Sequence, residues 1–201
     1  MLKGFFTLLK SMKNILEQAF PIQPIEAIKS LLTDISGVGQ RIVCLNGDIL
    51  EIPYRIYNDL PNFSQLNNLS TQELSIIYCL YSRHSDGYIR QEMVKKLIEI
   101  EFQDFMIPYV FLLVGEYVVE IINDIYPFIE KNKDFFIEFI KNNHELTILT
   151  YQRMVSYWNE YYRHSRYKYL KDYPGKRIFN LFNIMAVMRN LAVRNHLSHQ
   201  K

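Results

Sequence analysis

Residues 83–97, RHSDGYIRQEMVKKL, contain the clearest indication of the fold in this chain. The stretch predicts a tight turn followed by a helix. Asp86 lies at the expected helix N-terminus, where the helix dipole favours an anion, and Gly87 accommodates the turn. Apolar residues then recur with the spacing of one helix face, at Met93, Val94 and Leu97. We therefore predict two helices joined by a short turn, over about residues 72–83 and 88–100.

Helical periodicity extends from this stretch toward the C-terminus, with further helices predicted over about residues 108–126 and 133–142. On the N-terminal side, Ser70 or Thr71 is expected to cap the first helix, and Glu73 stands close to the capping-box position. The links between these helices are short, and short links make neighbouring helices run antiparallel. This part of the chain is therefore expected to pack as helical hairpins.

A different periodicity marks residues 41–57. Runs of β-branched residues flank the turn Asn46-Gly47-Asp48, and an Asn-Gly pair between such runs is the strongest short-range signal for a β-hairpin. Pro53 cannot donate to a strand ladder, so the second strand is expected to be an edge strand or to break there. Because a lone hairpin is only marginally stable, this one is expected to pack on the helices.

These patterns predict a mostly α protein of antiparallel helical hairpins with one small β-hairpin, folded as a single domain over residues 1–201. Residues 1–69 contribute N-terminal helices and the β-hairpin. The first of these helices is amphipathic and ends at Pro21. Residues 70–144 form the helical hairpins, and residues 145–201 form a basic, tyrosine-rich helical part.

Composition excludes several classes of protein. The charged share of 22% and the hydrophobic share of 49% are close to globular averages, which excludes a disordered chain. No apolar run reaches the roughly 18 residues that are needed to span a bilayer. Cys44 and Cys79 have no cysteine or histidine neighbour at metal-binding spacing. We interpret them as free thiols of a cytoplasmic protein that holds no cofactor or metal.

The turn within residues 83–97 resembles the inter-helix turn of HEAT-like helical repeats. In that family an Asp in the turn precedes a hydrophobic–Arg pair that opens the second helix, and here Asp86 precedes Ile89-Arg90. The resemblance covers one unit, residues 70–129. It implies an α-solenoid-like scaffold that binds partners along a concave face, without catalysis. Arg90 is expected to reach back to Asp86 or to an acidic residue of a stacked neighbour.

Two groups of polar residues in this central part are candidate sites. The first surrounds the turn and consists of Arg83, His84, Asp86 and Arg90. These residues can bind an anion or act on a substrate; the alternative is a polar network that fixes the turn. The second group is Glu116 and Glu120, one helical turn apart in apolar surroundings. Two such carboxylates can share a proton or bind a metal ion, and the alternative is that they pair with cations from adjacent helices, such as Arg90.

The C-terminal quarter is strongly basic. Residues 151–201 contain ten Lys and Arg against two Asp and Glu, whereas residues 1–150 contain thirteen against nineteen. One long helix is predicted over about residues 145–172, and a last helix from about residue 177. Aromatic and cationic side chains are interleaved along the long helix, and the candidate binding residues are Tyr157, Trp158, Tyr161, Arg163, Arg166 and Lys168. This pattern suits nucleic acid, an acidic protein partner, or neutralisation of the acidic first part of the chain.

Near the C-terminus, Arg194, Asn195 and His199 resemble the Arg-Asn-x-x-x-His signature of HEPN ribonucleases. The resemblance covers at most the last two helices. It implies that the Arg steadies an RNA phosphate while the His acts as acid or base. The leading interpretation of the chain is nevertheless a non-enzymatic helical scaffold that binds another protein. The alternatives are a HEPN-like ribonuclease or RNA-binding protein, and a ligand or metal protein built around Glu116 and Glu120.

Overall fold

The computed structural model describes residues 15–22, 28, 31–32 and 35–183. These residues are mostly helical and include one two-stranded antiparallel sheet, which confirms the predicted fold class. The strands β1 (Gly37–Leu45) and β2 (Asp48–Ile56) pair along their length, from Gly37 opposite Ile56 to Leu45 opposite Asp48. None of the described helices is long and apolar enough to cross a membrane.

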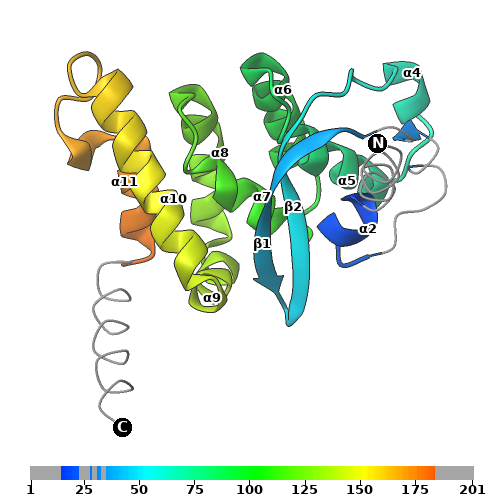
Figure 1. Cartoon of the computed structure of the whole chain (residues 1–201), viewed down its shortest axis with the longest axis horizontal. Helices are drawn as coiled ribbons and strands as arrows, with labels where there is room; N and C mark the ends of the chain where they lie inside the picture. Colours follow the sequence, from blue (N-terminus) through cyan, green and yellow to red (C-terminus); the bar gives the residue numbers. More distant parts are fainter. Residues whose placement is uncertain (1–14, 23–27, 29–30, 33–34, 184–201) are drawn as a thin grey trace, which may run out of the picture.

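The helices follow one another with short connections (Figure 1). Before the hairpin lies α2 (Ile15–Ala19). After it come α4 (Phe63–Leu66), α5 (Thr71–Tyr81), α6 (Gly87–Glu99), α7 (Met106–Leu113), α8 (Val119–Lys131), α9 (Lys133–Asn142) and α10 (His144–Tyr157). A π-helical turn (Trp158–Tyr162) extends α10, and a 3₁₀ turn (Leu170–Asp172) precedes α11 (Pro174–Leu181).

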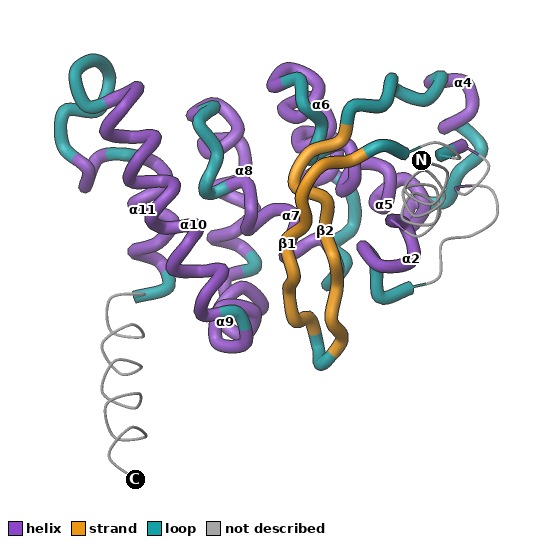
Figure 2. The backbone as a smooth tube through the Cα atoms, in the orientation of Figure 1, coloured by secondary structure: helices purple, strands orange, loops and turns teal. Residues whose placement is uncertain are grey.

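The helices pack in series, with α5 against α6, α6 against α8, α8 against α11, and α11 against α10. In Figure 1 the helices α6, α8 and α10 stand in a row. Seen in Figure 2, the hairpin is drawn in front of α7, between α8 and α5. Strand β2 contacts α2 and α5, while β1 contacts α9. The expected packing of the hairpin on the helices is therefore confirmed.

Local sequence signals explain where the central elements begin. The Ser70 hydroxyl accepts a hydrogen bond from the Glu73 N–H, and the Glu73 carboxylate accepts one from the Ser70 N–H, which completes the predicted capping box. Asp86 caps α6 by accepting a hydrogen bond of 2.7 Å from the Tyr88 N–H. In the hairpin turn, Asn46 and Gly47 have positive φ angles of 52° and 95°, as an Asn-Gly hairpin turn requires.

Both edges of the hairpin are hydrogen-bonded to helical segments. The Ile56 N–H donates to the Arg83 carbonyl at 3.0 Å, and the Ser85 N–H donates to the Ile56 carbonyl at 2.8 Å. On the other edge, the Asn143 side-chain amide accepts from the Cys44 N–H and donates to the Cys44 carbonyl, both at 2.7 Å. These contacts fix the hairpin between the α5–α6 turn and the α9–α10 junction. Strand β2 continues unbroken through its proline.

Two predicted helices are shorter in the structure. The helix predicted over 108–126 is interrupted between α7 and α8, where a Cβ atom on Gly115 would lie 3.1 Å from the Thr150 side chain of α10. The helix predicted over 145–172 loses α-helical geometry after Tyr157 and continues as the π-helical turn. In both places tertiary packing overrides a local helical pattern. Conversely, α8 continues past its internal proline to Lys131, where the sequence predicted a connection.

One continuous cluster of apolar side chains extends from Leu16 to Phe182 and includes all of α7. Three of the buried charged side chains are almost completely removed from water: Arg83, Arg90 and Glu116 are exposed by only 1%, 0% and 0%. Charges that are removed from water to this extent persist only when they are paired and hydrogen-bonded. The contacts that these three buried charges make are therefore the most unusual feature of the fold.

Candidate functional site: a buried arginine cluster under an arginine–tyrosine face

Glu116 lies in the loop between α7 and α8, and contacts from two sides hold this loop. On one side, α10 approaches Gly115 closely, and an added Cβ there would lie 3.1 Å from the Thr150 side chain. On the other side, the Tyr162 hydroxyl donates to the Tyr117 carbonyl and accepts from the Val119 N–H. The Glu116 carboxylate is thereby held in the interior, where it is fully buried.

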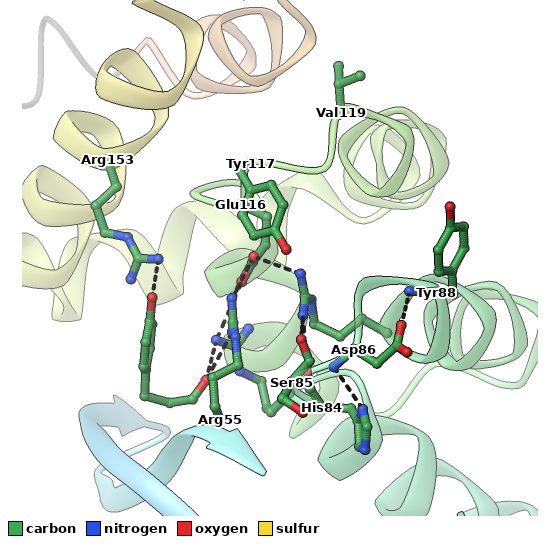
Figure 3. A network of polar contacts seen from close by, with 12 residues as sticks. Arg55, His84, Ser85, Asp86, Tyr88, Glu116, Tyr117, Val119 and Arg153 are labelled. Atoms are coloured by element: carbon green, nitrogen blue, oxygen red, sulfur yellow. Dashed lines mark hydrogen bonds and ion pairs between the residues drawn. The ribbon is translucent and has the colours of Figure 1, made fainter. Parts of the chain in front are cut away.

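Three arginines from different segments surround the Glu116 carboxylate (Figure 3). Arg55, on β2, makes the shortest contacts, with Nη2 2.8 Å from Oε1 and 2.7 Å from Oε2. Arg83 Nη2 lies 3.6 Å from Oε1, and Arg90 Nη2 lies 3.5 Å from Oε2. We define Arg55, Arg83 and Arg90 as the buried arginine cluster. The alternative in which Glu116 pairs with cations such as Arg90 is confirmed.

The cluster carries more positive than negative charge. Burial alone would raise the pKa of Glu116, but the charges of Arg83, Arg55 and Arg90, together with the Arg55 hydrogen bond, hold that pKa below its ordinary value. Burial lowers the pKa of Arg83 to about 9, although Glu116 acts in the opposite direction. Glu116 and Arg83 are therefore both ionised at neutral pH, and three buried arginines share one buried anion.

Several guanidinium N–H groups in the cluster have no acceptor among the residues that the structure describes. Arg83 donates through Nη2 to the Tyr54 carbonyl, but its Nε and Nη1 have no hydrogen-bond partner. Arg90 donates through Nη1 to the carbonyls of His84 and Ser85, whereas its Nε has no partner. Buried donors without partners are uncommon in folded proteins and cost free energy. The cluster is thus short of both negative charge and hydrogen-bond acceptors.

The four residues predicted around the α5–α6 turn have two different roles. His84 accepts the Asp86 N–H at Nδ1, so its other nitrogen, Nε2, carries the hydrogen that reaches the Asn58 carbonyl at 3.0 Å. His84 and Asp86 therefore fix the turn. Arg83 and Arg90 point instead to Glu116. Arg90 reaches this acidic residue of a neighbouring segment and not Asp86, because the Asp86 side chain is used as the cap of α6.

A second group of cations surrounds the Tyr54 ring, next to the cluster. The guanidinium carbons of Arg41 and Arg55 lie 4.7 Å from the ring centre, and that of Arg153 lies 4.9 Å from it. Arg153 also donates to the Tyr54 hydroxyl at 2.9 Å. Burial and the charge of Arg153 both lower the pKa of Arg41, which reflects the crowding of like charges.

Three further tyrosines continue this surface. Tyr117, which is 41% exposed, lies 5.9 Å from Tyr157 and 6.2 Å from Tyr161 between ring centres. The Arg153 guanidinium lies 5.8 Å from the Tyr157 ring. Tyr161, which is 56% exposed, belongs to the π-helical turn, a rare geometry that occurs often at functional sites. We define the arginine–tyrosine face by the residues Arg41, Tyr54, Tyr117, Arg153, Tyr157 and Tyr161.

The other predicted C-terminal residues make separate contacts. The Trp158 indole N–H donates to the Tyr167 carbonyl, and Arg163 donates to Asn159. Lys168 lies 5.6 Å from the Tyr169 ring centre. Arg166 lies 3.5 Å from Glu120 and makes the one ion pair that joins the described basic residues after position 150 to a carboxylate. In the described part of the chain, the acidic first part therefore contacts this segment through a single exposed ion pair.

Glu116 and Glu120 are not brought together. Glu116 is enclosed by arginines, whereas the Glu120 side chain is 53% exposed and pairs with Arg166. Within the described ranges, no group of three or more His, Cys, Asp or Glu side chains is arranged to hold a metal ion. The interpretation of these two glutamates as one shared site was therefore wrong.

Sequence reasoning missed Arg41, Tyr54 and Arg55 as site residues. Arg55 belongs to the predicted hairpin, and strand alternation places it on the face opposite Ile52 and Ile56, where a charged side chain is ordinary. One signal was available: Glu116 in apolar surroundings requires cations nearby, and an arginine on an adjacent packed element is the natural source. Which arginine supplies the charge depends on the tertiary packing of the hairpin.

The candidate catalytic residues Arg194, Asn195 and His199 lie outside the described residues. The chain matches no protein-family model, no curated protein sequence and no solved structure.

Proposed function

We propose that this protein is a non-enzymatic helical binding protein that docks an acidic segment of another protein on its arginine–tyrosine face. The observation that carries the proposal is an excess of cations on that face. Arg41 and Arg153 both approach the Tyr54 ring, and neither lies within ion-pair distance of a carboxylate in the described part of the chain. An acidic partner supplies the missing countercharge.

The chemistry of the face suits a protein interface. Tyrosine and arginine, with tryptophan, are enriched among the few residues that dominate the binding energy of protein–protein interfaces. The tyrosine rings of the face contact one another and the guanidinium groups, so little side-chain entropy remains to be lost on binding. The serial packing of α5, α6, α8 and α11 supports a HEAT-like, α-solenoid-like scaffold as the support for this surface.

RNA binding by the same basic segment is a second candidate. Lys168 and Lys171 both lie 5.6 Å from the centre of the Tyr169 ring, which is 56% exposed. An exposed ring flanked by cations can stack a base while the cations contact phosphates. Ribonuclease activity through Arg194 and His199 stays a prediction from the sequence.

Site-specific cross-linking tests the protein-binding proposal directly. The photo-reactive amino acid p-benzoylphenylalanine replaces Tyr161 in the arginine–tyrosine face or, as a control, Phe135, which is equally exposed on α9. Both variants are irradiated in extract of the source cells. Mass spectrometry then identifies any protein that is cross-linked through position 161 and not through position 135. The identified protein is purified and titrated against the wild type and against Arg153→Glu and Tyr161→Ala variants.

The proposal predicts an acidic partner whose binding weakens with salt and is lost in Arg153→Glu, while Phe135→Ala binds normally. A cross-linked product that ribonuclease removes would replace the protein proposal with RNA binding. A purified partner that binds Arg153→Glu as tightly as the wild type would show that another surface is used.

A further inference from the structure

We propose that the buried arginine cluster binds a phosphate group, which enters beside Arg153 and accepts the hydrogen bonds that Arg83 and Arg90 leave unmade. This small-anion site lies under the arginine–tyrosine face and goes beyond the function proposed above. It can be tested without knowledge of the protein partner.

The charge balance of the cluster identifies the class of ligand. Arg55, Arg83 and Arg90 carry three positive charges in the interior, and among the described residues Glu116 supplies the single negative charge within ion-pair distance of them. The remaining buried charge is +2. A phosphate monoester carries about −1.5 to −2 at neutral pH, so one phosphate group neutralises the cluster. A monovalent anion such as chloride would leave part of this charge uncompensated.

The unpaired donors also match a phosphate. Arg83 has two unpaired donors, Nε and Nη1, which point to different edges of its guanidinium, and Arg90 has an unpaired Nε. Guanidinium N–H groups donate charge-assisted hydrogen bonds to phosphate oxygens, and one phosphate has enough oxygens to accept from two arginines. Arg55 is already engaged, because its Nη2 contacts both oxygens of Glu116 and its Nη1 donates to the Tyr54 carbonyl.

Two partly exposed side chains, Tyr117 and Arg153, lie beside this site. Figure 3 shows Arg153 reaching from α10 toward the cluster, and Tyr117 above Glu116. Tyr117 is 41% exposed and Arg153 is half-buried, so both border solvent, whereas Arg83 is only 1% exposed. Arg153 and Arg83 meet at the same residue, because Arg153 donates to the Tyr54 hydroxyl and Arg83 donates to the Tyr54 carbonyl. An arriving anion therefore meets Arg153 first and Arg83 behind it.

Thermal unfolding of the full chain in inorganic phosphate tests the site, with sodium chloride at the same ionic strength as the reference. We expect phosphate to raise Tm along a saturable curve, because a ligand that binds only the folded state stabilises it. Chloride is expected to produce only a small change without saturation. Isothermal titration calorimetry with inorganic phosphate then gives the dissociation constant.

Two variants make the test specific, and a third serves as a control. Arg153→Gln removes the entry cation and is expected to weaken phosphate binding by roughly tenfold or more, as loss of a charge-assisted hydrogen bond does. The matched control is Arg163→Gln, at the residue that directly follows the π-helical turn, and it is expected to bind phosphate as tightly as the wild type. Glu116→Gln adds one net positive charge, so phosphate should raise its Tm by more than it raises that of the wild type.

The comparison of Glu116→Gln with the wild type separates a binding site from a structural role. If Glu116 were purely structural, phosphate would raise the Tm of both proteins by the same amount. Equal Tm changes in phosphate and chloride, or equal phosphate affinity of wild type and Arg153→Gln, would overturn the proposal.

If phosphate binds, titrations with O-phospho-L-tyrosine and with AMP identify the kind of phosphate compound that the site takes. Tighter binding of either one points to that kind of phosphate ester, and no gain over inorganic phosphate points to the free ion. Tyr161→Ala should affect partner binding alone, which keeps the two proposals distinguishable.

Discussion

Replacement of Glu116 by glutamine tests the physical basis of the buried arginine cluster. Glutamine keeps the shape of the side chain and one acceptor for Arg55. It removes the carboxylate that, within the part of the chain that the structure describes, alone lies at ion-pair distance from three arginines exposed by 10% or less. Removing one partner of a buried ion pair costs about 3–5 kcal/mol, because the opposite charge remains buried. We therefore expect Glu116→Gln to lower the free energy of unfolding by about this amount in chloride buffer.

Urea denaturation measures this loss, and the single tryptophan provides the signal. Trp158 is half-buried and its indole N–H is hydrogen-bonded to the Tyr167 carbonyl, so its fluorescence should change on unfolding. The control is Glu120→Gln, whose ion pair with Arg166 is exposed and should contribute less than about 1 kcal/mol. A Glu116→Gln loss no larger than that of Glu120→Gln would refute the reasoning.

The same pair of proteins gives a pH dependence of known sign. The folded-state pKa of Glu116 lies below the ordinary value of 4.5. The ionised carboxylate therefore stabilises the fold at pH values above about 4.5, and this contribution is lost as pH falls through the lower folded-state pKa. The stability difference between wild type and Glu116→Gln should shrink as pH decreases below that value. A constant difference between pH 7 and pH 3 would contradict the assignment.

Three further predictions concern other parts of the fold. Gly175→Ala should lower the free energy of unfolding by roughly 1–3 kcal/mol in urea titrations, because the added Cβ would lie 2.6 Å from Met154 Cγ. Asn143→Ala should expose the Cys44 amide to faster hydrogen exchange and cost about 1–3 kcal/mol, since both edge groups of β1 at that position lose their partner. A thiol reagent should modify half-buried Cys44 in the native protein long before Cys79, because Cys79 is fully buried and this burial raises the pKa of its thiol. Equal modification rates of the two thiols would contradict the described packing.

The strongest local signals in the sequence predicted the fold well. The Asn-Gly pair placed the hairpin turn at residues 46–47, and the Ser70–Glu73 and Asp86 caps placed the starts of α5 and α6. Each of these signals works through contacts between residues that are close in sequence. The fold class followed from them.

The interrupted helices could not be predicted in the same way. Residues 108–126 have helical periodicity throughout, and the break at Gly115 lies where the chain packs closely against Thr150, which is distant in the sequence. For the same reason, only part of the candidate site could be predicted from the sequence. Arg83 and Arg90 could be proposed because they flank a recognisable turn. The position of Arg55 beside Glu116, 61 residues away in the chain, is decided by how the hairpin packs.

The central claim is that the interior of this protein holds an anion-binding arginine cluster beneath its arginine–tyrosine face. Two-dimensional ¹H–¹⁵N NMR of the arginine Nε–H groups, recorded during titration with inorganic phosphate, tests it most directly. The account predicts saturable shifts of the Arg83, Arg90 and Arg153 signals with one dissociation constant, while the Arg163 signal stays in place. Small shifts of all four signals that follow ionic strength and do not saturate would contradict it.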